Sequence, residues 1–221
     1  MTASGPSAPD VSKGANGLSS PKAGPLSGVR VIDLTTVVMG PSATQILGDL
    51  GADVIKIESA GGDSMRWVGP NHTEGMGPLY LNANRNKRSV VLDLKDPEYR
   101  DALLSLLSGA DVFVSNMRPK AMARLGLGYE AIAAVKPDIV YCLAVGYGSD
   151  GPNAGQAVYY DLTQAGSGIA GLFGAIDGAP RYAPVNICDR VVGLYLTIAI
   201  ISALHHRAVT GEGQEIEVPM L

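Results

Sequence analysis

The sequence lacks the short motifs that mark common classes of nucleotide, metal and hydrolytic enzyme. No GxGxxG follows the first apolar run, and there is no P-loop, CxxC, HExxH or GxSxG motif. These absences argue against nicotinamide and flavin enzymes, P-loop NTPases, zinc proteases and serine hydrolases. His72 lies in a loop, and the adjacent His205 and His206 would point in different directions on a helix. We therefore expect no metal site.

Charged residues, cysteines and long hydrophobic runs are also scarce. The net charge is −4 with 17% charged residues, so no global basic field exists to hold a nucleic-acid backbone or an anionic membrane. Cys142 and Cys188 sit in apolar runs and indicate buried free thiols in a reducing compartment. No run reaches the ~18 apolar residues that span a bilayer, and the longest, 191–204, is typical of a buried helix. We expect a cytoplasmic protein that binds neither nucleic acid nor membrane.

The amino-terminal 25 residues differ in composition from the rest of the chain. They are rich in Ser, Gly, Pro and Ala and contain no apolar segment of the signal-peptide type. Such a composition cannot bury enough apolar surface to fold. We predict a disordered leader over 1–25 and an ordered region over 26–221.

Residues 26–221 alternate between short apolar runs and helical segments. Strands are predicted at 28–34, 53–58, 89–94, 111–115, 138–145 and 215–218. Helices are predicted at 41–50, 97–108, 118–125, 129–135, 161–170 and 191–207. Strand, helix and strand in succession form the βαβ unit of a parallel sheet. The pattern predicts a Rossmann-like open α/β sheet with helices on both faces. The glycine-rich loops 59–78 and 146–155 are expected to be functional.

Carboxylates and basic residues are the remaining chemical groups of interest. Asp189 precedes the most apolar predicted helix, where an aspartate is favoured as the N-cap. A carboxylate is also ionised at neutral pH and can act as a nucleophile without a separate base. Both interpretations of Asp189 stay open. The basic residues near strand ends could bind phosphates or could be ordinary surface charge; they are Arg66, Lys87, Arg88, Lys95, Arg118 and Arg124.

The order of several segments resembles one enzyme family. They are LSGVRVIDL (26–34), MGP (39–41), LGDLGADVIKIE (47–58), NRNKRS (84–89), LDLK (92–95), NMRP (116–119), RLG (124–126), GYGSDGP (146–152), YDLTQAGSG (160–168), Asp189 and RAVTGEGQ (207–214). In this order they resemble the family III CoA-transferases, which include formyl-CoA transferase, carnitine CoA-transferase and α-methylacyl-CoA racemase. The resemblance covers nearly everything from residue 26 onward.

The resemblance implies a fold, a substrate and a reaction. Family members bind CoA on a Rossmann-like domain and interlock as homodimers, and in the transferases an aspartate becomes acylated and then forms an aspartyl-CoA thioester. The matching aspartate is Asp189. No tightly bound cofactor is implied; the substrates are an acyl-CoA and a small carboxylic acid. The positions that match CoA contacts are Val38, Met39, Ser59, Leu92, Asp93, Leu94, Lys95, Asn116, Met117, Arg118, Arg124, Tyr159 and Tyr160.

The sequence departs from the family pattern at informative places. Tyr160 stands where the racemases carry a histidine, which favours a transferase over an isomerase. Oxalate-specific members carry a glutamine at the position of Val38 and a basic residue near Ser59, so formyl or oxalyl specificity is not expected. Family members are also roughly twice as long, so we expect the second domain of the family to be absent from this chain. An isomerase, or a CoA-binding fragment without independent activity, are the alternatives.

Overall fold

The computed structural model describes residues 24–221, which form one parallel sheet flanked by helices. The six strands are ordered β3-β2-β1-β4-β5-β6. They are β1 (Arg30–Leu34), β2 (Asp53–Glu58), β3 (Lys87–Val91), β4 (Val112–Ser115), β5 (Val140–Val145) and β6 (Gln214–Pro219). Every pairing is parallel, and the strand order reverses direction between β1 and β4. This order is the doubly wound arrangement of Rossmann-like folds, so the predicted fold class is confirmed.

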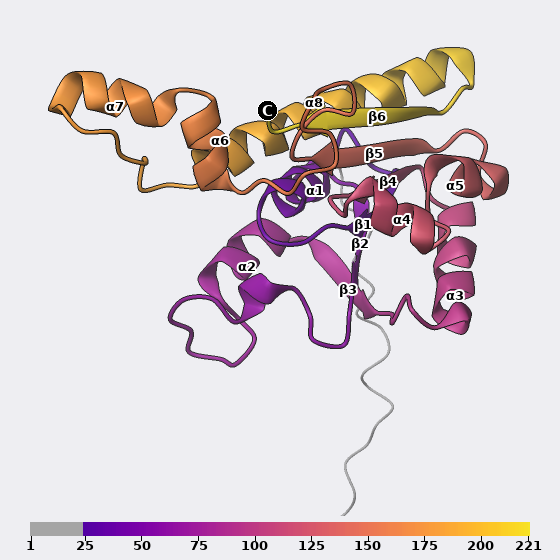
Figure 1. Cartoon of the computed structure of the whole chain (residues 1–221). Coiled ribbons are helices and arrows are strands. Elements are labelled where there is room, and N and C mark those ends of the chain that lie inside the picture. The colour runs from indigo at the N-terminus through magenta and orange to yellow at the C-terminus, as the bar shows by residue number, and fades with distance from the viewer. Residues whose placement is uncertain (1–23) are drawn as a thin grey trace, which may run out of the picture.

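Helices connect the strands and cover both faces of the sheet. They are α1 (Met39–Asp49), the short 3₁₀ helix η2 (Ser64–Arg66), α2 (Pro78–Asn84), α3 (Pro97–Ser108), α4 (Pro119–Arg124), α5 (Tyr129–Val135), α6 (Tyr160–Gly166), α7 (Ile169–Asp177) and α8 (Ile187–Thr210). Helices α3, α4 and α5 lie on one face, and α1 and α8 lie on the other (Figure 1). Residues 1–23 of the predicted leader lie outside the described residues.

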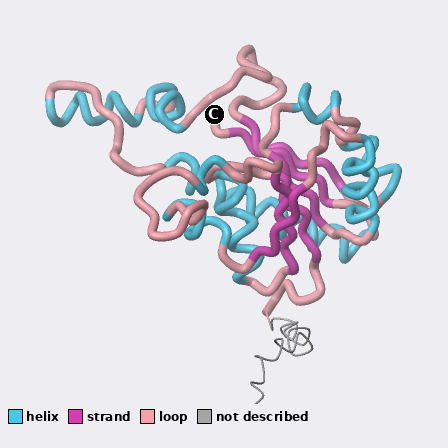
Figure 2. Tube along the Cα trace, turned by 90° about the horizontal axis from the view of Figure 1, so that it is seen from below, coloured by secondary structure: helices cyan, strands magenta, loops and turns pink. Residues whose placement is uncertain are grey.

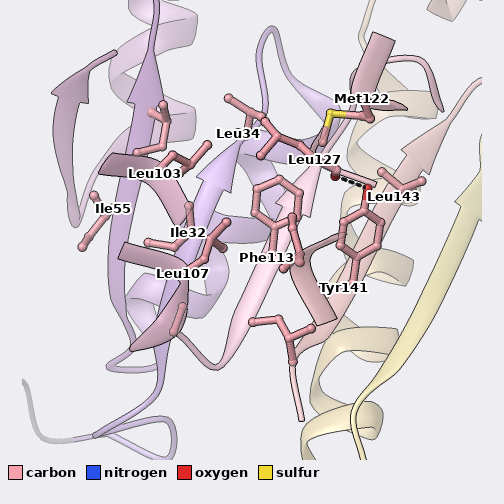
Figure 3. Close-up of a cluster of buried hydrophobic side chains, with 14 of the residues drawn as sticks. Ile32, Leu34, Ile55, Leu103, Leu107, Phe113, Met122, Leu127, Tyr141 and Leu143 are labelled. Carbon is pink, nitrogen blue, oxygen red and sulfur yellow. Dashed lines mark hydrogen bonds between the residues drawn. The ribbon is translucent and has the colours of Figure 1, made fainter. Parts of the chain in front are cut away.

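The two faces of the sheet carry side chains of different size. Toward α3–α5 the strands present large side chains, including Ile32, Phe113 and Tyr141 (Figure 3). The buried Tyr141 hydroxyl donates a hydrogen bond to the Leu127 carbonyl oxygen at 3.0 Å, which satisfies its polar atom inside the core. Toward α1 and α8 the strands present mainly valine, alanine and Cys142. Smaller side chains allow these two helices to approach the sheet and each other closely.

Strand β3 and helix α2 correct the sequence prediction. The third strand was expected at 89–94, but it begins at Lys87 and ends at Val91. Lys87 enters the sheet because its side chain is buried in an ion pair with Asp33, a long-range contact that hydrophobic periodicity does not reveal. Helix α2 follows the loop 59–78 directly and was not predicted.

The region of 160–178 forms two helices where one, 161–170, was expected. Helix α6 ends near Gly168, which adopts a left-handed conformation with φ of 85°, and α7 starts immediately afterwards. Helix α7 projects away from the sheet (Figures 1 and 2). Its side chains Leu172 and Ile176 are 66% and 79% exposed, so the helix contributes little to the core.

Helix α8 is longer than the predicted 191–207. It covers 24 residues, and among the described helices it alone is long and apolar enough to cross a membrane by length and composition. The core helix of a soluble protein passes the same test. Its buried residues, including Leu196 and Ile200, pack against α1 and the sheet, as a core helix does.

The core between α3 and the sheet allows a prediction about stability. Leu107→Ala removes a fully buried side chain between α3 and the sheet. We expect the free energy of unfolding to fall by about 2–5 kcal/mol, because lost transfer energy and a new cavity add together. Leu81→Ala, at a side chain that is 51% exposed on α2, serves as the control and should change little. Urea unfolding checks both; equal losses would contradict the assigned core.

Candidate functional site

The carboxyl ends of β1 and β4 form the point at which the strand order reverses. In open α/β sheets, ligands bind in the crevice at such a switch point. The loop after β1 and the loop after β4 are joined there by two hydrogen bonds. The Thr36 amide donates to Asn116 Oδ1 at 3.0 Å, and Asn116 Nδ2 donates to the Thr36 carbonyl oxygen at 2.8 Å. Asn116 is thereby fixed next to the residues that lead into α1.

Asp189 lies in the first turn of α8 and is 8% exposed. The prediction that it caps the helix is wrong: the N-cap is Asn186, which makes no side-chain cap hydrogen bond. The helix begins two residues before Asp189, at Ile187, so Asp189 lies inside its first turn. Burial raises the pKa of Asp189, while its backbone amide and Arg190 oppose that rise. The result is a partly desolvated carboxylate near the positive end of a helix dipole.

Close packing of α8 on α1 brings Asp189 toward the switch point. A Cβ atom at Gly193 would lie only 3.1 Å from the Met39 carbonyl oxygen, so a larger residue there would require the two helices to move apart by a few tenths of an ångström. Gly193 is one helical turn after Asp189. Arg190 fixes the same contact, since it donates to Ser42 Oγ at 3.0 Å and to Asn82 Oδ1 at 2.7 Å. Asp189 therefore stands beside the first turn of α1.

A second group of candidate positions follows β2 and β3. Ser59 lines a cavity of about 290 Å³ together with Arg66, Trp67 and Val91. The Leu92 amide donates to the Glu58 carbonyl oxygen at 2.9 Å, so the chain leaving β3 runs beside the end of β2. This group therefore lies at the same carboxyl edge of the sheet as the first.

The thirteen candidate CoA positions differ in their surroundings. Val38, Met39 and Leu92 are buried, so they can offer mainly backbone groups or a side-chain edge to a ligand. Asn116 and Met117 are half-buried, and Leu94 packs partly on the core. The exposed positions are Ser59, Asp93, Lys95, Arg118, Arg124, Tyr159 and Tyr160. The described contacts place Asn116 next to the positions after β1. They also place Leu92 near Ser59. They do not bring Arg124 or the tyrosine pair to either group.

The six basic residues near strand ends separate into two sets. Lys87 is buried against Asp33 at 2.9 Å, Arg66 is paired with Glu58 at 2.6 Å, and Arg88 reaches Asp53 at 2.7 Å. Surface charge was therefore the wrong interpretation for Lys87. Within residues 24–221, no ion pair involves the other three, which are Lys95, Arg118 and Arg124. They remain available to an anionic ligand.

The match to a protein family decides how this site is interpreted. The family model described as CoA-transferase family III matches residues 26–221. The chain belongs to CoA-transferase family III. The resemblance stated from the sequence is thereby confirmed.

Individual relatives agree with the family assignment. The chain is 42% identical to succinate–glutarate CoA-transferase of Agrobacterium fabrum over 89% of its length, and 41% identical to human succinyl-CoA:glutarate CoA-transferase over the same share. A solved CAIB/BAIF family protein from Brucella suis superposes with a TM-score of 0.86 at 39% identity, over 90% of this chain and 54% of that one. The chain spans about half the length of the curated relatives it matches, 51% of the Agrobacterium protein and 45% of the human one.

A set of buried charges beneath this candidate site escaped the sequence analysis. Asp33 is fully buried and accepts hydrogen bonds from the hydroxyls of Thr35 and Thr44, in addition to Lys87. Lys56 and Asp63 form a second buried pair with Nζ and Oδ2 3.0 Å apart. The signal that could have found them is charge inside an apolar run: Lys56 interrupts the strand 53–58.

Hydrogen bonds and neighbouring charges shift the pKa values at this edge. Burial alone would raise the pKa of Asp33, but Lys87, Lys56 and the two hydroxyls lower it to about 2. Burial also opposes ionisation of Glu58, yet hydrogen bonds from Arg66, Ser89 and the Asp63 amide lower its pKa to about 2. Burial lowers the pKa of Lys87 to about 8, against the attraction of Asp33.

These pKa shifts predict that the stability of the fold decreases in acid. A carboxyl group whose folded pKa lies below its unfolded value stabilises the fold above the unfolded pKa, and this contribution is lost as the pH falls. For Glu58 the window runs from about pH 4.5 down to about pH 2. Glu58→Gln should lower stability at pH 7 and make the stability curve flatter within this window. Urea unfolding as a function of pH tests this; a variant curve parallel to that of the wild type would contradict it.

Proposed function

We propose that this chain transfers CoA between an acyl-CoA and a carboxylic acid, with Asp189 as the nucleophile. The observation that carries the proposal is the place of Asp189. It is a buried carboxylate in the first turn of α8, one turn before Gly193, which packs against the start of α1. A partly desolvated carboxylate is a stronger nucleophile than a hydrated one, and it needs no separate base.

The reaction proceeds through covalent intermediates on Asp189. The carboxylate attacks the thioester carbonyl, the C–S bond breaks, and an acyl-aspartyl anhydride and CoA thiolate form. The thiolate then attacks the aspartyl carbonyl, which releases the donor acid as its carboxylate and leaves an aspartyl-CoA thioester. The acceptor carboxylate attacks this thioester, giving a new anhydride and the thiolate. Attack of the thiolate on the acceptor carbonyl yields the product acyl-CoA and regenerates Asp189.

Three unpaired cations support binding of the CoA phosphates. CoA carries a pyrophosphate and a ribose phosphate, and exposed basic side chains can neutralise them. Lys95 follows β3, Arg118 follows β4, and Arg124 ends α4. Arg118 stands two residues after Asn116, which is fixed at the switch point. We assign the three to phosphate binding.

The relatives indicate the class of acid. The two glutarate enzymes are 41–42% identical to this chain, and an acetyl-CoA:oxalate CoA-transferase of Acetobacter aceti is 43% identical. All three names contain a dicarboxylic acid. We propose a dicarboxylic acid as acceptor and succinyl-CoA as the first donor to test. Val38 and Ser59 argue against oxalate, so oxalate enters the acceptor panel as the contrasting substrate.

A homodimer is proposed as the assembly, as the family resemblance implies. Exposed apolar side chains on α7 and α8 support association, since large apolar surfaces on a soluble domain commonly mark interfaces. They include Leu172, Ile176, Leu194, Tyr195 and Ile198, each more than half exposed. We place this assembly in the cytoplasm.

Trapping of the covalent intermediate tests the proposal. The chain is incubated with succinyl-CoA, treated with hydroxylamine, and digested for mass spectrometry. We expect a hydroxamate on Asp189 that is absent from Asp189→Ala. Asp161→Ala, at a carboxylate in the first turn of α6, is the matched control and should retain the labelling.

The negative outcomes separate the alternatives. CoA binding without labelling would support a CoA-binding fragment whose site is completed by further chain. Exchange of the α-proton of a 2-methylacyl-CoA in heavy water, without labelling, would support an isomerase. Absence of CoA binding would overturn the proposed function.

The phosphate assignment makes a separate prediction. Arg118→Ala should weaken CoA binding about ten- to a hundredfold, in line with about 1.5–3 kcal/mol for a charge-assisted hydrogen bond. The dependence of binding on salt concentration should also become shallower. Arg88→Ala is the control, because Arg88 pairs with Asp53 at the opposite edge of the sheet. Calorimetric titration with CoA checks both variants; equal effects would contradict the assignment.

A further inference from the structure

Val37 adopts a backbone conformation that its side chain disfavours. Its φ is 74°, and within residues 24–221 the one other non-glycine residue with positive φ is Asn86. Asparagine tolerates this region, whereas for a β-branched residue such as valine it is a genuine outlier. Strained conformations persist only where the surrounding structure holds them, and they concentrate at functional sites.

Three consecutive residues are held from three directions. Lys56 Nζ donates to the Thr35 carbonyl oxygen at 2.7 Å. Asn116 exchanges two hydrogen bonds with Thr36. The Val37 amide donates to Asp63 Oδ1 at 3.2 Å. The loop between β1 and α1 is therefore fixed by strand β2, by the loop after β4 and by the loop after β2.

Lys56 and Asp63 are unusual among these contacts because both are fully desolvated. Their side chains are 1% and 0% exposed. Asp63 Oδ2 accepts no hydrogen bond among the described residues and is balanced by the Lys56 ammonium 3.0 Å away. Asp63 is itself oriented, since its amide donates to Glu58 at 2.8 Å and its Oδ1 also accepts from Met65. Buried ion pairs contribute little net stability compared with apolar residues, so stability alone does not account for this pair.

The strained loop determines where α1 begins. Val38 and Met39 follow Val37 directly and form the N-cap and first residue of α1. The Met39 carbonyl oxygen lies against Gly193, one turn after Asp189. A change of φ at Val37 would therefore displace the residues that stand beside the proposed nucleophile.

We propose that Lys56 and Asp63 are positioning residues for the transferase reaction. They hold Thr35–Val37 in the strained conformation, so that the first turn of α1 and Asp189 keep the separation that the acyl transfer requires. This inference rests on the proposed function of Asp189. According to this inference, the two buried residues affect the rate of the chemical step and not the affinity for CoA.

The test replaces both charges together so that neither is left buried without a partner. The 221-residue chain carrying Lys56→Met and Asp63→Ala should unfold near the wild-type midpoint, because apolar replacement of a buried pair is often neutral. At saturating succinyl-CoA its rate of Asp189 labelling should fall about a hundredfold, the effect expected of a misplacement near 1 Å. The dissociation constant of CoA should change little.

Substitution of Val37 separates positioning from a structural role. Glycine adopts positive φ as readily as negative φ. Adding Val37→Gly to the double variant should therefore restore most of the labelling rate, and Val37→Gly alone should label as the wild type does. A folded double variant that labels at the wild-type rate would overturn the inference. So would a loss of rate that Val37→Gly does not restore. Absence of labelling in the unsubstituted chain would instead overturn the proposed function, and this inference with it.

Discussion

Two lysine–aspartate pairs without access to water hold together the carboxyl edge of the sheet. Lys87 joins the edge strand β3 to Asp33 at the centre and also donates to the Pro41 carbonyl oxygen in α1 at 2.9 Å. Lys56 joins β2 to the loop before α1. Because desolvated charges tolerate few geometries, these contacts restrict the strands, the loop and the start of α1 to one arrangement. The geometry of the candidate site depends on that arrangement.

The elements whose ends depend on local signals could be predicted from the sequence. Helix α3 was expected at 97–108 and occupies those residues, because Asp96 caps it, accepting from the Glu98 amide, and Pro97 fits its first position. Strand β2 was also predicted with its observed bounds, 53–58. Strand β3 was not, because its first residue is set by an ion pair to a residue 54 positions away.

The sequence suggested candidate site residues but not the charged contacts that surround them. Family resemblance pointed to Asp189 and to the loops after β1 and β4, and the fold places those loops at the switch point. A helix cap was one of two interpretations of Asp189, but α8 begins before it, at Ile187. Lys56 was marked only by its charge within an apolar run, and its pairing with Asp63 could not be predicted, because that contact depends on the fold and not on any spacing along the chain.

Helix α8 connects two distant parts of the molecule. Its first turn carries Asp189, and near its last turn Arg207 is anchored to Asp111 at 2.8 Å, beside the amino end of β4. Twenty-four helical residues extend about 36 Å. Asp189 and Arg207 are 18 residues apart, so about 27 Å of helix separates the candidate nucleophile from this ion pair. Because α8 packs against α1 and the sheet along this length, the position of the carboxylate depends on contacts made far from the candidate site.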